Sequence, residues 1–375
     1  MILDISDASF KKLLNDKELY LPIRWNGSDF FATLNNLFDH YVKQVEKSKN
    51  EKESLYYSAC VDTEEIKQVC DWLKKAVKHY LNGFPSKSYS SFKRAMTILM
   101  GNPLKIYQKS VMEQFDKPTD NYYDELKLFR VVSVNDNKPY SRTRIFHTPY
   151  NLRSKVSTSR YSIAGYPSLY LGTTLALCCE ETHINSDHNF ALASLFQLER
   201  SIEYSNTNIR VIELGVKPQD FLNLEDTNES RERHISRDLL MDSDIRSAYL
   251  LWYPLIASCS YIRIDKSDPF AAEYIIPQLL MQWVRNEIGS KKGGKRDQLV
   301  GIRYFSCASV RASEMGFNYV FPTSGKQKSA ELPYCSVLLK AFRLTSPVYI
   351  NEYDNLYTCE RKLIQSNALD FIKNV

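Results

Sequence analysis

The sequence predicts an α+β protein in which a helical N-terminal region precedes a region rich in short strands. Apolar residues recur at three- and four-residue spacing through the first 120 residues, which is the spacing of one helix face. From Leu126 onward this pattern gives way to short β-rich runs separated by loops and a few helices. A chain of 375 residues is long enough for two domains, and we expect them at residues 1–120 and 121–375.

Three helices are expected in the N-terminal region. The first covers residues 30–47, where the apolar positions follow one helix face. The second begins at Asp62, because Glu65 three residues later gives a capping-box-like start, and it ends at Gly83. The third covers residues 90–100, before a Gly-Asn-Pro sequence that breaks helices.

The second region is predicted to contain short strands and one clear helix. Strands are expected at residues 128–132, 169–171, 208–214, 261–264 and 299–304, and along the tail from 337 to 350. Pro277 is placed as a first-turn proline of a helix that runs to Ile288. The basic, glycine-containing loop at residues 290–296 is either a solvated connection or a phosphate contact.

Charge and composition limit the classes of partner. The chain has 49 basic and 44 acidic residues, a net charge of +5, which suits small anions but falls short of a nucleic-acid-binding signature. Its eight cysteines form no CxxC pair, so we expect buried thiols and no metal site.

The chain is expected to be a reduced, cytoplasmic, soluble protein. Its N-terminus lacks the basic-then-apolar order of a signal peptide. The longest apolar run, from Tyr249 to Ile262, is interrupted by Pro254 and is too short to span a bilayer. No membrane association is therefore predicted.

The most informative segment is residues 145–182. Arg160 precedes a Gly/Pro turn, Tyr170 follows on a short apolar strand, and Glu181 lies on the next helix, which Thr173 or Thr174 can cap. An arginine suits a pyrophosphate, and a carboxylate suits a developing positive charge.

Each of these residues also has an ordinary structural interpretation. Arg160 could be a surface arginine, and a tyrosine on a strand is common in a chain with 25 of them. Glu181 falls on or beside the apolar stripe of its helix, where a carboxylate needs a partner or a function. A carboxylate turned into water at the helix end is the alternative, and Glu180 competes for the same role.

The ordered set resembles the RES-domain family, named for its Arg, Glu and Ser. In that family an arginine precedes a Gly turn, a tyrosine closes the next strand, and a glutamate lies near the end of the following helix. Arg160, Tyr170 and Glu181 match this order, and the resemblance extends over about residues 126–310. The chain departs from the shorter members, which carry a glycine-rich arginine–tryptophan turn where this sequence has SRYS.

Three further residues enter through the resemblance. GIRYFS, residues 301–306, looks like the segment that carries the motif serine, so Ser306 is the match. LFRVVS resembles the strand that opens the domain and brings in Arg130. The segment around His147 resembles a longer subgroup, although a histidine beside phenylalanine and proline is more often structural.

The resemblance implies an ADP-ribosyltransferase-like fold: a twisted, mostly antiparallel sheet with flanking helices, preceded by the helical N-terminal domain. It also implies an enzyme that cleaves the nicotinamide–ribose bond of NAD and passes ADP-ribose to inorganic phosphate or water. NAD is then a substrate, phosphate a co-substrate, and no cofactor is expected. Such an enzyme depletes NAD as a toxin or defence protein does.

The same resemblance implies a role for each matched residue. Arg160 would bind the pyrophosphate, Tyr170 would stack on the nicotinamide or its ribose, and Glu181 would stabilise the oxocarbenium-like charge. Ser306 would orient the ribose, while Arg130 and His147 would assist in substrate binding.

Two other functions remain open at this stage. The chain could transfer ADP-ribose to a macromolecule, or it could sense NAD or ADP-ribose without turnover. The partners expected are NAD, a separate antitoxin or regulatory protein, and a second copy of the chain. The N-terminal region is predicted to regulate or oligomerise, with extra core packing as the alternative.

Overall fold

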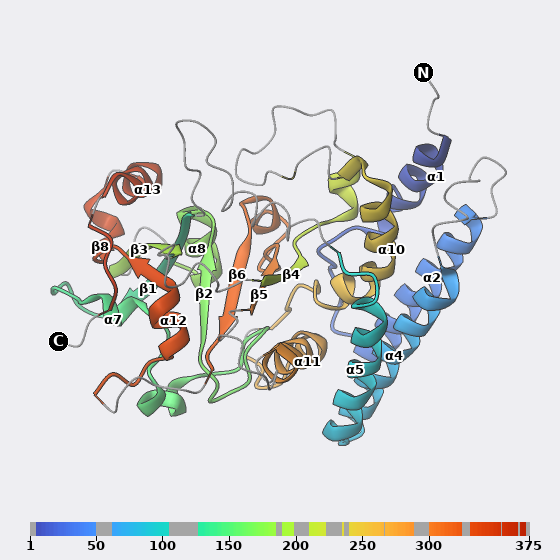
Figure 1. The fold of residues 1–375 in the computed structure, drawn as a ribbon, viewed down its shortest axis with the longest axis horizontal. Helices are drawn as coiled ribbons and strands as arrows, with labels where there is room; N and C mark the ends of the chain where they lie inside the picture. The colour runs from blue at the N-terminus through green and yellow to red at the C-terminus, as the bar shows by residue number, and fades with distance from the viewer. Residues whose placement is uncertain are drawn as a thin grey trace. The chain divides into compact units, whose positions relative to one another are not determined.

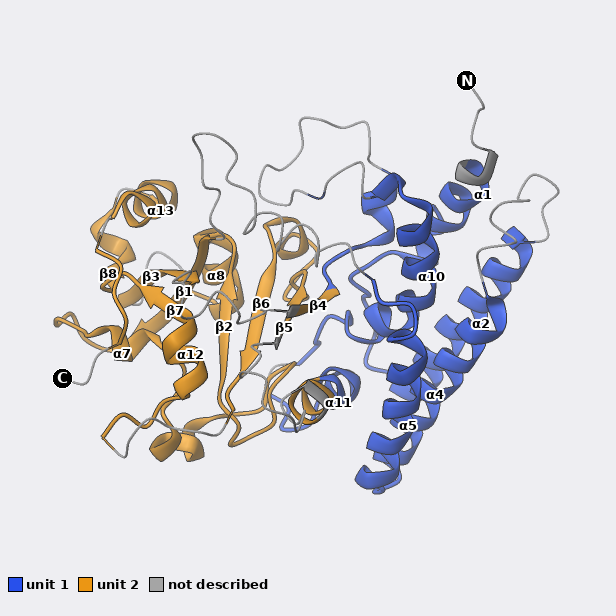
Figure 2. Ribbon diagram, viewed as in Figure 1, with its two compact units in different colours: residues 1–106, 214–280 blue, residues 107–213, 281–375 orange. Residues whose placement is uncertain are grey.

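The chain divides into two compact units (Figures 1 and 2). The helical unit comprises residues 1–106 and 214–280, and the sheet unit comprises residues 107–213 and 281–375. The computed structural model describes residues 5–49, 62–104, 127–184, 190–198, 210–222, 235, 240–265, 267–288, 300–324, 331–353, 355–366 and 368–372.

These units divide the chain differently from the boundary expected near residue 120. Residues 214–280 group with the N-terminal helices because α10, Ser243–Ser258, is apolar on all sides and is buried along almost its whole length. The prediction of separate regulatory and catalytic roles for residues 1–120 and 121–375 is a matter of function and stays a prediction.

The predicted N-terminal helices are present. They are α2 (Phe30–Lys49), α4 (Thr63–Leu81) and α5 (Pro85–Leu99), and α1 (Ile5–Leu14) precedes them. The Asp62 carboxylate caps α4 as predicted, accepting bonds from the Glu64 and Glu65 amides at 2.9 and 3.1 Å. Helix α5 begins five residues earlier than expected, since Pro85 occupies its first turn.

Helix α10 forms the core of the helical unit and contacts α4. Two buried tyrosine hydroxyls join this core to other segments of the unit. Tyr41 on α2 donates to the Leu250 carbonyl at 2.7 Å, and Tyr253 on α10 donates to the Leu19 carbonyl at 2.9 Å. Each hydroxyl thereby satisfies a backbone oxygen that would otherwise be buried without a partner.

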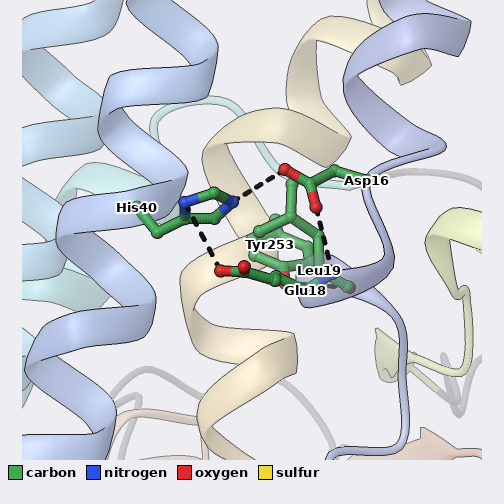
Figure 3. A network of polar contacts seen from close by, with 5 residues as sticks. All are labelled: Asp16, Glu18, Leu19, His40 and Tyr253. Atoms are coloured by element: carbon green, nitrogen blue, oxygen red, sulfur yellow. Dashed lines mark hydrogen bonds and ion pairs between the residues drawn. The ribbon is translucent and has the colours of Figure 1, made fainter.

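A polar network lies beside this core (Figure 3). The two ring nitrogens of His40 face two carboxylates, Asp16 at 2.7 Å and Glu18 at 3.5 Å. Asp16 also accepts a bond from the Glu18 amide at 3.0 Å, which caps the short helix at Lys17–Leu19. The side chains of His40, Asp16 and Glu18 all remain partly accessible to water.

The sheet unit is built on a mostly antiparallel open sheet. Among the described residues it has eight strands, in the order β4-β5-β6-β2-β1-β3-β7, with β8 paired to β3. The strands are β1 (Lys127–Val134), β2 (Ser168–Gly172), β3 (Phe190–Leu198), β4 (Arg210–Leu214), β5 (Val300–Tyr304), β6 (Asn318–Pro322), β7 (Phe342–Leu344) and β8 (Val348–Tyr349). The expectation of a mixed α+β protein with a mostly antiparallel sheet is confirmed at this level.

Two helices cover part of this sheet. Helix α8 (Leu175–Thr182) and helix α13 (Leu356–Gln365) pack against β1 and β3. Their cluster contains Phe129, Val131, Leu175, Cys178, Cys179, Ala191, Ala193, Leu195, Cys359 and Leu363, all buried. This apolar contact fixes α8, the helix that carries Glu181, on the sheet. The seven cysteines that the structure describes are buried thiols, as the sequence predicted.

Several strand predictions need correction. Residues 261–264 form no strand, because Tyr261 makes only an isolated bridge to Ile23. The tail from 337 is helical at first, as α12 (Ser336–Ala341), and only then enters β7 and β8. An apolar run of this length suits either a buried helix or a strand, so periodicity alone could not distinguish them.

The helix predicted from Pro277 to Ile288 is present in two parts. Helix α11 covers Ile275–Trp283, and a π-helical turn continues it over Val284–Ile288. The smaller helical segments of the sheet unit are α7 (Arg142–Ile145) and the short turns at Tyr150–Lys155, Ala312–Glu314 and Ile350–Glu352. In the helical unit the other short turns are Pro218–Phe221 and Ala272–Tyr274. Within the described part of the chain, no helix combines the length and apolar character needed to cross a membrane.

Candidate active site

The turn between β2 and α8 requires a glycine and a threonine. A Cβ atom on Gly172 would lie 2.7 Å from the Cys178 sulfur, so only glycine lets the helix return this closely to the strand. Thr174 then caps the helix, its hydroxyl oxygen accepting a bond from the Leu177 amide at 3.1 Å. Of the two threonines predicted to cap α8, Thr174 is therefore the one that does so.

The same turn is bonded to the segment that leads into β6. The Thr173 amide donates to the Phe317 carbonyl at 3.0 Å, and the Thr173 hydroxyl accepts from the Phe317 amide at 2.9 Å. The Thr174 hydroxyl donates to the Met315 carbonyl at 2.8 Å. These bonds place the start of β6, at Asn318, beside helix α8.

Glu181 is held by that strand. Its carboxylate Oε1 accepts a hydrogen bond from the Asn318 amide nitrogen at 2.5 Å. Asn318 is 5% exposed and lies opposite Gly172 of β2 and Tyr304 of β5, at the point where three strands end side by side. The half-buried carboxylate thus projects from α8 toward the ends of these three strands in a fixed orientation.

Glu180, the alternative carboxylate, has no such partner among the described residues. It is half-buried, and no hydrogen bond or ion pair joins its side chain to the residues that the structure describes. Of the two candidate carboxylates of α8, Glu181 is therefore the one whose orientation is fixed by a described partner.

Tyr170 organises the turn that carries Arg160. The backbones of Ser159 and Ser162 bond to each other in both directions, at 2.9 and 3.1 Å, so Arg160 and Tyr161 occupy the tip of a tight turn. The Tyr170 hydroxyl bonds to both serine hydroxyls, at 2.7 and 2.8 Å. The phenol therefore fixes both ends of the turn, and Arg160, only 9% exposed, is held in place.

The pKa of the Tyr304 hydroxyl is affected by burial and by Glu181, Tyr170 and Arg160. Burial raises the pKa of Tyr304 well above its usual value, and the nearby Glu181 and Tyr170 raise it further, while Arg160 opposes them. Tyr304 also packs on Tyr161, with ring centroids 4.7 Å apart. Sequence reasoning missed Tyr304, although it lies in the GIRYFS segment that was singled out for Ser306.

Arg130 is a cation without a carboxylate partner among the described residues. It lies on β1, next to β2, and its Nη1 atom donates to the Tyr170 carbonyl at 2.9 Å. Its Nε atom is enclosed and makes no hydrogen bond. Burial lowers the pKa of Arg130 to about 10, and the described groups that act on this pKa include no Asp or Glu. A cation desolvated in this way favours an anionic ligand.

The other two predicted residues lie inside the protein. Ser306 is fully buried, and its hydroxyl oxygen accepts a bond from the Ala308 amide at 3.1 Å. His147 is also fully buried: Nδ1 donates to the Thr148 carbonyl at 2.8 Å, and Nε2 accepts from the Cys335 amide at 2.9 Å. Burial lowers its pKa to about 4, so the ring is neutral and structural, the second of its two sequence interpretations.

Next to the Arg160 turn is a cleft of about 230 Å³. It includes Tyr161 and Ser162 from that turn and Arg285 from the π-helical turn. Sequence reasoning assigned no role to this helix. The basic loop at residues 290–296 lies outside the described residues. Among those described, no three His, Cys, Asp or Glu side chains are grouped so as to hold a metal ion.

Comparison with known proteins gives one relative. The chain is 28% identical over 334 residues to a Bacillus subtilis (strain 168) protein named "Putative toxin YopC", a match that covers 88% of this chain and 68% of that protein. No protein-family model matches the chain, that of the RES domain included. No solved structure matches it either. The resemblance to the RES family therefore depends on the residues described above.

Proposed function

We propose that the chain is an enzyme that degrades NAD by cleaving the nicotinamide–ribose bond, with a toxin-like role. The observation that carries this proposal is the fixed carboxylate. Glu181 is held by Asn318, which lies opposite Tyr304, and Tyr304 packs on Tyr161 in the Arg160 turn that Tyr170 holds. A toxin-like role is supported by the name of the Bacillus subtilis relative, which covers most of the chain.

The charges suit this reaction. As the bond breaks, its electron pair moves to the pyridinium nitrogen of nicotinamide, and positive charge develops on the ribose carbon. Glu181, oriented before the reaction, stabilises that charge, and phosphate or water then forms the new bond to the same carbon. Arg160 and Arg130 bind the pyrophosphate of the dinucleotide, which neutralises them.

The tyrosines have separate roles in this proposal. Tyr170 holds the Arg160 turn through its hydroxyl and offers its ring to the nicotinamide side. Tyr304 stays protonated at neutral pH, because its pKa is raised, and can donate a hydrogen bond to the ribose. Ser306 acts indirectly, by shaping the turn that follows β5.

The proposal also includes the type of fold, the cellular compartment and a protective partner. We assign the sheet unit to the ADP-ribosyltransferase type, on the basis of its antiparallel sheet and the order of the matched residues. The enzyme acts in the cytoplasm, where NAD is available. A separate antitoxin or regulatory protein protects the host cell.

The test is to incubate the purified full chain with NAD, with and without inorganic phosphate, and to quantify nicotinamide and the ADP-ribose product. Glu181→Gln should lower the rate by about 100- to 1,000-fold, as loss of a positioned electrostatic group does. Glu180→Gln is the matched control, because it makes the same change one residue away and should retain activity.

The products identify the acceptor. Phosphate-dependent ADP-ribose-1″-phosphate indicates a phosphorylase, and ADP-ribose in either condition indicates a glycohydrolase. Transfer of labelled ADP-ribose from NAD to a macromolecule would instead indicate a transferase. Binding of NAD without nicotinamide release, or equal rates for Glu181→Gln and wild type, would contradict the proposal.

The toxin-like role has its own test. Induced expression of the wild-type chain in bacteria should lower cellular NAD and arrest growth, whereas the Glu181→Gln variant should do neither. Growth arrest by both the wild type and the variant would show that toxicity does not depend on NAD cleavage.

A further inference from the structure

The cleft beside the Arg160 turn is lined mainly by polar and aromatic side chains. They include Tyr161, Ser162, Tyr166, Ser168, Gln282 and Arg285. Two serines, a glutamine and an arginine thus line one cavity, and their side chains are of the kinds that can donate hydrogen bonds to an oxyanion. At about 230 Å³ the cavity is smaller than the usual range of about 300–1,000 Å³ for drug-sized ligands. It suits a phosphate with a small attached group.

Arg285 is the only cation of this cleft among the described residues. It makes no hydrogen bond or ion pair with the described residues, and its guanidinium carbon lies 5.2 Å from the centre of the Tyr166 ring. Tyr166 is 48% exposed, so the pair stands at the opening of the cleft with its donors available. Stacking on an aromatic ring orients a guanidinium without using its hydrogen-bond donors.

The electrostatic environment of Arg285 also favours an anion. Burial lowers its pKa, and Arg153 lowers it further, while Tyr150, Tyr166 and the Cys335 thiol oppose the change. No described carboxylate is among these neighbours. The buried pair of Arg303 and Glu213, at 3.2 Å, shows how the same unit neutralises a different arginine. At Arg285 a bound anion would have that role.

Two side chains that line the cleft also contact residues of the candidate active site. The Ser162 hydroxyl bonds to the Tyr170 hydroxyl at 2.8 Å, and the Tyr161 ring packs on Tyr304. Arg285 itself lies on a π-helical turn, a geometry that occurs frequently at functional sites. A ligand in the cleft would therefore be a neighbour of the group bound at Arg160.

We propose that this cleft is a second phosphate-binding subsite, in which Arg285 and the serine hydroxyls hold a phosphate group other than the one at Arg160. The phosphate is either the adenosine-side phosphate of the pyrophosphate, with Arg160 and Arg130 then holding the nicotinamide-side one, or inorganic phosphate as co-substrate. Assigning it to one of these sources rests on the proposed function, whereas anion binding by the cleft does not.

The test is calorimetric titration in the Glu181→Gln background, where turnover is suppressed. Inorganic phosphate and NAD are titrated separately into this protein and into the same protein carrying Arg285→Met. Loss of a charge-assisted contact should weaken binding by about 10- to 100-fold. The control is Arg361→Gln, which removes an exposed arginine from α13. Removal of Arg285 should not lower the melting temperature and could raise it, because this desolvated cation makes no hydrogen bond or ion pair within the described fold.

The outcomes separate the two sources. Weaker phosphate binding with unchanged NAD binding identifies the co-substrate site, and the reverse identifies a site for the dinucleotide. Weakening of both supports a phosphate subsite that either can occupy. Equal affinities with and without Arg285, for both ligands, would overturn the proposal. Failure of the proposed function would appear differently, as an absence of nicotinamide release while phosphate binding still depends on Arg285.

Discussion

Two lysines of the helical unit and two arginines of the sheet unit have opposite surroundings. On α2 and α4, each of two lysines meets two carboxylates: Lys67 is paired with Glu46 and Glu64, and Lys74 with Asp39 and Asp71. In the sheet unit, Arg130 and Arg285 are more enclosed and meet no carboxylate among the described residues.

Under the proposed function, this difference separates charges that serve the fold from charges that serve a ligand. An exposed ion pair contributes little to stability, and losing it costs little. A desolvated cation without a partner lowers stability unless something binds to it. Its presence in a fold therefore indicates a functional site more strongly than any paired charge does.

The two histidines provide the largest test of this comparison. His40 faces two carboxylates, whereas His147 faces backbone groups only, and its pKa of about 4 lies below the ordinary 6.5 because it is buried. Between these two pH values the unfolded chain binds more protons than the folded chain, so stability falls as pH falls. We expect His147 to contribute a loss of about 3 kcal/mol from pH 6.5 to pH 4.

Denaturant unfolding of wild type and His147→Gln at several pH values measures this loss. The difference in free energy of unfolding between the two proteins should shrink as the pH falls through that window, while His40→Gln leaves the His147 contribution unchanged. A difference that is constant with pH would mean that the imidazole is not buried in its neutral form.

Arg130→Met tests the unpartnered cation. The catalytic efficiency with NAD should fall by about 10- to 100-fold, because a charge-assisted contact to the pyrophosphate is lost. The free energy of unfolding should fall by no more than about 1.5 kcal/mol, the value of the lost bond to the Tyr170 carbonyl, or should even rise. Full activity combined with severe destabilisation would identify Arg130 as a structural residue.

Asp62→Ala tests a polar group that serves the fold alone. Loss of the cap on α4 should lower the free energy of unfolding by about 1 kcal/mol. NAD turnover by the folded protein should not change. Asp62→Asn is the matched variant, since asparagine also caps helices, and it should restore most of the stability. Thermal melting and nicotinamide release together check both statements.

Lys74→Met should have the smallest effect. Its two carboxylate partners are largely exposed, so the free energy of unfolding should change by less than about 1 kcal/mol. Activity should equal that of wild type. A loss of activity comparable with that of Arg130→Met would remove the distinction between the two kinds of charge.

Local signals predicted the parts of the fold that local contacts determine. Helix α4 was predicted from Asp62, Gly83 and the apolar stripe between them, because capping and periodicity act within a few residues. Strand β3 was missed, since it is buried on both faces from Ala191 onward and shows no alternation. Helix α10 was missed because it is apolar on all sides and contains Pro254.

The candidate site, too, could be predicted only as far as local sequence signals reach. The helix pattern left both Glu181 and Glu180 open, and only the family resemblance favoured Glu181. Asn318 could not be found, because it meets Glu181 only through the pairing of β2 with β6 and the turn that joins α8 to it. Tyr304 and Arg285 likewise reach the site through packing between distant segments.

The pairing of Glu181 with Asn318 has a consequence for protein synthesis. The two residues are 137 positions apart, and Asn318 belongs to β6, which inserts between β2 and β5. While the ribosome is still making the chain, Glu181 emerges long before its partner does. A nascent chain, or one truncated before Asn318, therefore lacks the oriented carboxylate. Under the proposed function, the cell that makes this protein meets NAD cleavage only after β6 has been translated.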